Sequence, residues 1–199
     1  MKRTTTRRKR EMKHFLADNR RLFPFIALFL AGVGAGVAVW LTTYRTLPTD
    51  LLTLSPVESG AAGWFRALGE ACFSTVVLLG VLYLLGLWAC GTPFILLIPL
   101  FHGIGLGLTE AFYYRTGLSG VGIVAALVMP IGLLNGAVLI AACAESVRLS
   151  TCLSRRLLPG GEEQNLWSGF RLYSLRFLLF ILAAIVVAVI EVLLRQIVL

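Results

Sequence analysis

The chain has 199 residues, of which 58% are hydrophobic, and its mean hydropathy is +0.86. A soluble domain of this size cannot remove so much apolar surface from water, so a soluble globular fold is excluded and an all-α integral membrane protein is predicted. The formal net charge is +8, and nine of the eighteen basic residues lie within the first 21 positions. A basic block before an apolar run is typical of a topology signal or an anionic-lipid contact, and we predict no nucleic-acid partner.

The polar residues 1–22 are predicted to form a basic cytoplasmic tail, and residues 23–199 a membrane domain of five transmembrane helices. The first span is expected at about 23–43. Its apolar run is too long for the h-region of a signal peptide and no A-x-A-like site follows it, so we expect an uncleaved anchor. Gly32 and Gly36 form a G-x-x-x-G pair in this span, which is typical of close helix packing in lipid.

The second span is predicted at about 71–89, after a loop over residues 44–69 that Pro and Gly residues interrupt. Arg66 and Glu70 stand one helical turn apart and are expected to begin its helix. A short turn then leads to the third span, at about 93–114, where Pro93 suits the first position of a helix.

The third span and the fourth, at about 120–144, form a hairpin around which the chain is organised. The third contains Gly103 and Gly107, and the fourth contains Gly132 and Gly136, so each carries a G-x-x-x-G pair. We therefore predict that these two spans pack on each other at the core of the bundle. Each span also holds an internal proline, which is expected to kink it.

This hairpin resembles the stage II sporulation protein M family. The shared features are Gly-Thr-Pro before an apolar run, His-Gly-Ile-Gly-Leu-Gly at 102–107, a Tyr-rich tip at 113–114 and Met-Pro at 129–130. The polar pair that often follows the helix proline in that family is replaced here by Ile131-Gly132. The resemblance implies a bacterial cytoplasmic-membrane protein that recruits or positions peptidoglycan-remodelling hydrolases during sporulation and engulfment.

Residues 145–174 are predicted to be a cytoplasmic amphipathic segment that extends the fourth helix and breaks at Pro159-Gly160-Gly161. The fifth span is expected at about 175–194. With a cytoplasmic N-terminus, fourteen basic residues lie inside and four outside, an asymmetry that predicts this orientation. Five spans then place the C-terminus outside.

Three side chains within the spans form a candidate polar site: His102, Glu110 and Asn135. An ionisable group inside a span is a functional-site hypothesis by default. His102 is interpreted either as a proton-sensitive or ligand-contacting group or as a partner in an interhelical hydrogen bond, with Asn135 as the first candidate. Glu110 is expected to face a water-filled outer cleft or to pair with an arginine. The arginines considered are Arg45, Arg66 and Arg115.

The remaining residues do not indicate catalysis. The four cysteines form no C-x-x-C pattern, so neither a metal site nor a disulfide framework is predicted. Glu191 and Arg195 stand four residues apart and are expected to form a local ion pair. We find no Walker motif, no G-x-S-x-G motif and no Ser/His or Cys/His pair at a shared depth. We therefore predict no enzymatic activity and no cofactor.

Three functional hypotheses follow from these observations. The first is a non-enzymatic membrane scaffold like stage II sporulation protein M, with the lipid bilayer and membrane proteins, including cell-wall hydrolases, as partners. The second is a transporter or permease subunit whose path is lined by His102, Glu110 and Asn135. The third and weakest is an intramembrane enzyme. A transporter predicts a water-accessible lumen joining the three polar residues, whereas a scaffold predicts a dry bundle.

Overall fold

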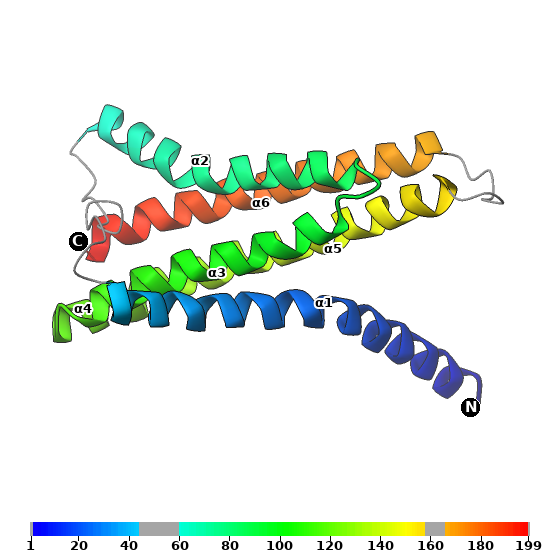
Figure 1. The fold of residues 1–199 in the computed structure, drawn as a ribbon, viewed down its shortest axis with the longest axis horizontal. Coiled ribbons are helices and arrows are strands. Elements are labelled where there is room, and N and C mark those ends of the chain that lie inside the picture. The colour runs from blue at the N-terminus through cyan, green and yellow to red at the C-terminus, as the bar shows by residue number, and fades with distance from the viewer. Residues whose placement is uncertain (1, 44–59, 158–165, 199) are drawn as a thin grey trace.

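The structure is a computed structural model that describes residues 2–43, 60–157 and 166–198 (Figure 1). Regular structure in these residues is entirely helical. The elements are α1 (Lys2–Thr43), α2 (Ala61–Gly86), α3 (Thr92–Tyr114), α4 (Leu118–Ile123), the π-helical segment η2 (Val124–Val128), α5 (Met129–Leu157) and α6 (Leu166–Val198). No break separates α4, η2 and α5 along the chain, so these three elements form one long rod.

Five helical stretches in the described residues are long and apolar enough to cross a membrane. They are Leu22–Thr43, Ala61–Gly86, Thr92–Tyr114, Leu118–Ser154 and Gly169–Val198. This confirms the prediction of an all-α chain with five helices that can span a bilayer. Between 17% and 39% of the most apolar part of each stretch is buried within the bundle, so most of each surface is free to contact lipid tails.

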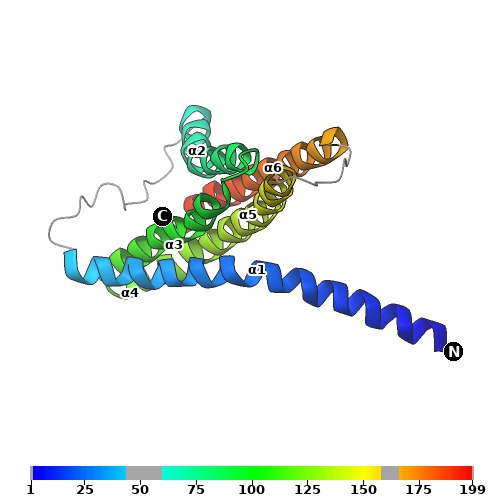
Figure 2. The same ribbon diagram turned by 45° about the vertical axis from the view of Figure 1, so that its right-hand side comes forward.

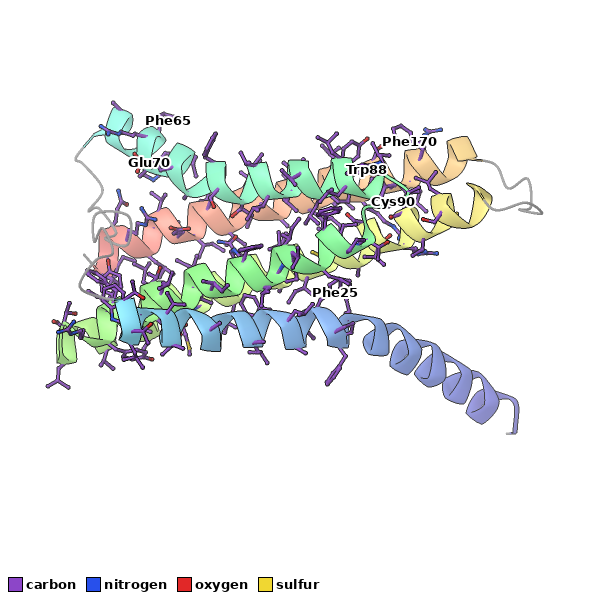
Figure 3. The ribbon with its side chains drawn as sticks, viewed as in Figure 1. Phe25, Phe65, Glu70, Trp88, Cys90 and Phe170 are labelled. Carbon is purple, nitrogen blue, oxygen red and sulfur yellow. The ribbon has the colours of Figure 1, made fainter. Side chains whose placement is uncertain are left out.

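The helices lie side by side and alternate in direction (Figures 1 and 2). One end of the bundle carries the start of α1, the turn at 87–91, the end of α5 and the start of α6, and is called the basic end. Trp88, Cys90 and Phe170 lie there, whereas Phe65 and Glu70 lie at the opposite, far end (Figure 3). The central helix is α5, which packs on α1, α2, α3 and α6, and the most extensive contact joins α1 to α3.

Two boundaries differ from the sequence-based prediction. Helix α2 begins at Ala61 rather than near 71, directly after Gly60, whose φ of 111° is a backbone conformation that favours glycine. Arg66 and Glu70 accordingly lie inside the helix rather than at its start. Residues 2–22, predicted as a separate tail, are continuous with the first span in α1, because they contain many good helix formers and neither Gly nor Pro.

The amphipathic segment predicted at 145–174 is also divided differently. Its first part belongs to α5, which ends at Leu157, and its last part belongs to α6, which begins at Leu166. The span predicted to start near 175 is thus the continuation of a helix that starts nine residues earlier. The predicted break at Pro159-Gly160-Gly161 lies outside the described residues.

The proline of the fourth span coincides with a local change of helix type. Pro130 has no N–H to donate to the carbonyl of Ala126, and its ring crowds that carbonyl. The preceding residues form η2, where the amide of Met129 donates to Val124, five residues back. By contrast, α3 continues through Pro99 without interruption.

The largest buried cluster joins all five long helices, α1, α2, α3, α5 and α6, towards the basic end. Its members are apolar side chains with almost no exposed surface, including Leu79, Leu82, Ile95, Leu139, Cys143 and Phe177. Many large apolar side chains point outward instead, as expected for helices solvated by lipid. Examples from three helices are Phe101, Leu134 and Leu178.

Candidate functional site

Four glycines form the closest contact between α1 and α3. A Cβ atom built on Gly32 would lie 3.2 Å from the Cα atom of Gly103 and closer still to the carbonyl oxygen of Leu100. A Cβ atom on Gly107 would lie 3.1 Å from the Cα atom of Val33. Gly36 makes the equivalent approach to α3, so the two G-x-x-x-G pairs face each other on parallel helices. Backbone meets backbone here, which only glycine permits.

The middle glycines of the two G-x-G-x-G runs lie elsewhere. Positions Gly34 and Gly105 have no heavy atom within 4 Å of a built Cβ, apart from neighbouring residues and the backbone of their own helix. Two residues along a helix turn a side chain by about 200°, so these glycines face away from the contact. They provide an internal comparison for the contact glycines, since the residue type and the helix are the same.

The third and fourth spans pack on each other in the structure, but the backbone that Gly103 and Gly107 approach belongs to α1. On α5, each glycine instead makes room for a side chain from another helix. A Cβ atom on Gly132 would lie 3.2 Å from Cγ of Leu106, and one on Gly136 would lie 3.0 Å from Cζ of Phe29. Three helices carry similar glycine pairs, and the spacing alone does not identify which two of these helices pack on each other through their glycines.

The ring of Phe29 fills the junction of α1, α3 and α5. It stacks on the imidazole of His102, with ring centroids 6.0 Å apart and ring planes at 26°. Only 4% of Phe29 is exposed, and the end of its ring contacts Gly136. The apolar ring therefore occupies the space beside His102 that a path between α3 and α5 would need.

His102 does not form the predicted hydrogen bond with Asn135. Its Nε2 atom is buried and has no hydrogen-bond partner in the described part of the chain. Asn135 is half-buried on α5, one turn beyond the buried Ile131. The stacking on Phe29 explains the difference, because the imidazole packs against α1 rather than reaching across to Asn135.

Glu110 is buried near the far end of α3, with 7% of its surface exposed. One of its expected partners, Arg66, pairs with Glu70 instead, with Nε 3.3 Å from Oε1. Another, Arg45, lies outside the described residues. Glu110 is eight residues from His102, which corresponds to about 12 Å along the helix axis. The structure therefore does not bring the three predicted polar residues together.

A serine row on α5, which no sequence-based prediction includes, binds the end of α2 and the turn at 87–91. Ser146 donates a hydrogen bond to the carbonyl of Leu82 at 3.1 Å, and Ser150 donates to that of Trp88 at 2.8 Å. Ser154 donates to the carbonyl of Ala89. The spacing of four residues puts all three hydroxyl groups on one helix face, and this spacing is the signal that could have revealed them.

Tyr173 of α6 completes this network at the basic end. Its hydroxyl lies 3.2 Å from Oγ of Ser146 and donates to the carbonyl of Tyr83 at 3.1 Å. Gly86 leaves the room for it, since a Cβ there would lie 2.9 Å from Cζ of Tyr173. These contacts connect α2, α5 and α6 through hydrogen bonds that have little competition from water.

Two ion pairs connect helical residues near opposite ends of the bundle. Arg176 of α6 contacts Glu145 of α5 at 2.5 Å near the basic end. Glu191 and Arg195 form the predicted pair near the end of α6, which confirms that prediction. Arg195 is largely buried, with 8% of its surface exposed.

The described residues contain no group of three His, Cys, Asp or Glu side chains that could hold a metal ion. The cysteines at 72, 90, 143 and 152 are free thiols. A surface depression is lined by Arg66, Gly69, Glu70 and Phe73, and none of the three predicted polar residues belongs to its lining. The contacts that are present serve helix packing and hydrogen bonding between helices.

Comparisons of the chain with protein-family models, with curated proteins and with solved structures found no match. The resemblance to the stage II sporulation protein M family therefore rests on the hairpin residues and stays a prediction. The five long apolar helices support a multi-pass helical membrane protein.

Proposed function

We propose that the chain is a non-enzymatic scaffold of the bacterial cytoplasmic membrane, with its N-terminus in the cytoplasm and its C-terminus outside. In this proposal it binds membrane-associated peptidoglycan hydrolases, such as an amidase or a lytic transglycosylase, and positions them during cell-wall remodelling. The class of partner comes from the resemblance to stage II sporulation protein M. The orientation comes from the excess of basic residues at the basic end.

The observation that carries the proposal is the position of Phe29. A transport path through His102 and Asn135 requires a water-accessible space at the junction of α1, α3 and α5. The buried ring of Phe29 lies in this junction, between His102 and Gly136. A junction that an apolar ring fills supports the scaffold over the transporter.

The contacts elsewhere in the bundle also suit a scaffold, which must hold its outer surface in a fixed shape. Backbones meet at Gly32 and Gly103, where neither helix can shift without losing contact. The serine row and Tyr173 hold α2, α5 and α6 together at the basic end. Large apolar side chains remain on the outer faces of these helices for lipid or for a partner helix.

The second candidate function is a transporter or permease subunit, and one observation favours it. Nε2 of His102 is buried without a hydrogen-bond partner in the described residues. Buried polar atoms usually have a partner, so such an atom calls for an explanation. A bound solute or a transferred proton would provide the partner that the described side chains do not.

The experiment is site-specific photo-crosslinking in cells, followed by purification in mild detergent and identification of the adducts. Photoreactive residues replace the outward-facing Leu30, Phe101 or Leu178, one at a time. The scaffold predicts an adduct with a peptidoglycan hydrolase at one or more of these positions. The matched control is the fully buried Leu82, which should give no adduct with another protein.

A transport assay separates the two candidates. Purified protein is reconstituted in vesicles and proton movement across the membrane is followed with a pH-sensitive dye. Proton flux that His102→Gln abolishes, together with the absence of hydrolase adducts, would contradict the scaffold and establish the second candidate.

A further inference from the structure

Glu110 is a buried carboxyl group to which the contacts described above give no role. It lies in the span Thr92–Tyr114, four residues before the end of α3, which corresponds to about 6 Å along the helix axis. Only 7% of its surface is exposed, and no hydrogen bond or ion pair within the described residues involves its side chain. A buried polar group without a partner calls for a physical explanation.

Helix periodicity places Glu110 on the face of α3 that meets α1. Gly103, Gly107 and Glu110 follow one another at intervals of four and three residues, which puts them on one helix face. The two glycines of this row approach the backbone of α1 at Gly32 and Val33. Glu110 therefore continues the row of α3 along which the two backbones meet.

Two further contacts hold the end of α1 on α3 at the level of Glu110. A Cβ atom on Gly36 would lie 3.0 Å from the backbone nitrogen of Leu108. The ring of Trp40, which is 4% exposed, packs edge-on against Phe112 with ring centroids 5.7 Å apart. Since Leu108 and Phe112 stand on either side of Glu110 in the sequence, the carboxyl group lies in the turn of α3 that these two contacts enclose.

The other side of this turn is covered by η2 and α5. Leu106, four residues before Glu110, fills the space at Gly132 of α5. Tyr113, three residues after it, is buried in one cluster with Val124 of η2. Figure 1 shows the ends of α1 and α3 beside α4 at the far end of the bundle. Glu110 is thus the one carboxyl group in a junction of apolar helix faces.

The helices around this junction provide no positive charge. Residues 22–43 of α1, 118–128 of α4 and η2, and 129–144 of α5 contain no Asp, Glu, Lys or Arg. Arg115, just past the end of α3, forms no ion pair with Glu110. The described residues also contain no group of three side chains that could hold a metal ion. Within the described residues, neither an ion pair nor a metal site accounts for this carboxyl group.

The charge state follows from these surroundings. An ionised carboxylate is costly among apolar side chains at membrane depth, because nothing there replaces the water that it loses. Addition of one proton removes the charge and leaves a neutral group with one hydrogen-bond donor. The titratable side chains on the same helix are Tyr113 and His102, and His102 is eight residues away. The nearest source of a proton is the water at the far end, about one helical turn from Glu110.

We propose that Glu110 is a proton-binding site, and that its neutral carboxyl group keeps the end of α1 packed on α3. The carboxylate takes one proton from the water at the far end and returns it there, and no other bond changes. Once ionised, it has to reach water, so the contacts at Gly36 and Trp40 open. This site does not depend on the scaffold role. It also requires no transport, because the ring of Phe29 fills the space beside His102.

Labelling with dicyclohexylcarbodiimide tests the neutral carboxyl group directly, since this apolar reagent modifies protonated carboxyl groups in apolar surroundings. The full-length protein in proteoliposomes is treated near neutral pH, and the modified residue is identified by mass spectrometry of its peptides. We expect Glu110 to be modified several-fold faster than Glu70, Glu145 and Glu191, each of which is paired with an arginine. Alkaline buffer should slow the modification.

The same substitution at two buried carboxyl groups distinguishes a bound proton from a paired cation. Glu110→Gln should leave the thermal midpoint in detergent unchanged near neutral pH, because the amide is neutral and has nearly the same shape. Glu191→Gln is the matched control. It should lower the midpoint by about 4 °C or more, because the buried Arg195 loses its carboxylate partner.

The fluorescence of Trp40 reports whether the end of α1 stays on α3. Trp64, Trp88 and Trp167 are replaced by phenylalanine, which leaves Trp40 as the only tryptophan. Trp40 should be shielded from a water-soluble quencher near neutral pH and become accessible in alkaline buffer. With Glu110→Gln it should stay shielded in both buffers.

Three results would overturn the proposal. The first is modification of Glu110 by the carbodiimide no faster than that of the paired carboxyl groups. The second is a fall of the midpoint in Glu110→Gln as large as that in Glu191→Gln, which would mean that the carboxylate is paired with a cation. The same fall in Arg45→Gln would then identify Arg45, which lies outside the described residues, as that cation. The third is an alkaline response of Trp40 that persists in Glu110→Gln.

Discussion

The thiol of Cys143 on α5 donates a hydrogen bond to the carbonyl oxygen of Ile95 on α3, at a distance of 3.9 Å. This carbonyl is the one that Pro99, four residues further on, leaves without an intrahelical donor. Both Cys143 and Ile95 are fully buried in the cluster that joins the five long helices. The side chain of one span thus satisfies the backbone of another where a proline interrupts the hydrogen-bond ladder, which explains how α3 continues through Pro99.

A double-mutant cycle tests this contact. Cys143→Ala should lower the free energy of unfolding by roughly 1 kcal/mol, the scale of intramembrane hydrogen bonds, because the Ile95 carbonyl loses its donor. In the background Pro99→Ala the same change should cost less, since the new amide of residue 99 can bond to Ile95. The free energy of unfolding is measured in mixed micelles. If Cys143→Ala lowers it equally in both backgrounds, the thiol does not compensate for the amide that Pro99 lacks.

The α1–α3 contact predicts a sharp difference between neighbouring glycines. Gly103→Leu should destabilise the bundle by about 2 kcal/mol or more, because a side chain there meets the backbone of Gly32. Gly105→Leu is the matched control and should be neutral, since that position is open. The thermal midpoint in detergent is the readout, and similar midpoints for both variants would mean that α1 and α3 do not meet at Gly103.

For His102, the structure predicts a different effect of substitution on stability than the hydrogen bond with Asn135 would. A hydrogen bond with Asn135 would make His102→Leu destabilising and His102→Gln tolerated. Since Nε2 has no partner in the described residues, His102→Leu removes a buried polar atom and should leave the thermal midpoint unchanged or raise it. A clear fall of the midpoint in His102→Leu, with none in His102→Gln, would restore the hydrogen-bond interpretation.

The proposed orientation predicts which ends of the bundle a membrane-impermeant thiol reagent reaches in intact cells. The native Cys90 is exposed in the turn at the basic end, and Leu118 is 93% exposed at the far end. We expect Leu118→Cys to be labelled in intact cells and Cys90 only after the membrane is opened. The matched background carries Cys72→Ala and Cys152→Ala. Labelling of Cys90 from outside would invert the topology.

The five spans could be predicted from sequence because apolar length alone determines which helices can cross a bilayer. The start of α2 was missed because Arg66 and Glu70 lie within the helix and lower its local hydropathy. The partner of Gly103 was missed for a different reason. Glycine spacing indicates that a helix can approach another helix closely, but the same spacing starts at Gly32 in the first span and at Gly132 in the fourth. Gly103 meets the backbone at Gly32, whereas the side chain of Leu106 fills the space at Gly132 and that of Phe29 the space at Gly136.

For the polar residues too, the sequence identifies the residues but not their partners. His102, Glu110 and Asn135 were identified as unusual for apolar helices, which composition suffices to show, but their partners depend on helix rotation. In the structure His102 stacks on Phe29, and its Nε2 atom has no hydrogen-bond partner in the described residues. The serine row at 146, 150 and 154 could not be predicted because serine is common in membrane helices, and its role depends on carbonyls in the last turn of α2 and in the turn at 87–91.

Water accessibility beside Phe29 tests the filled junction, the central claim, most directly. In a background carrying Cys72→Ala, Cys90→Ala and Cys152→Ala, Asn135→Cys is exposed to a small charged thiol reagent added to both sides of proteoliposomes. Thr116→Cys, at an exposed turn, is the positive control. We predict no reaction at residue 135 while Phe29 is present, and a reaction when Phe29→Ala empties the junction. Rapid reaction at residue 135 with Phe29 intact would reveal a water-filled path and contradict the scaffold.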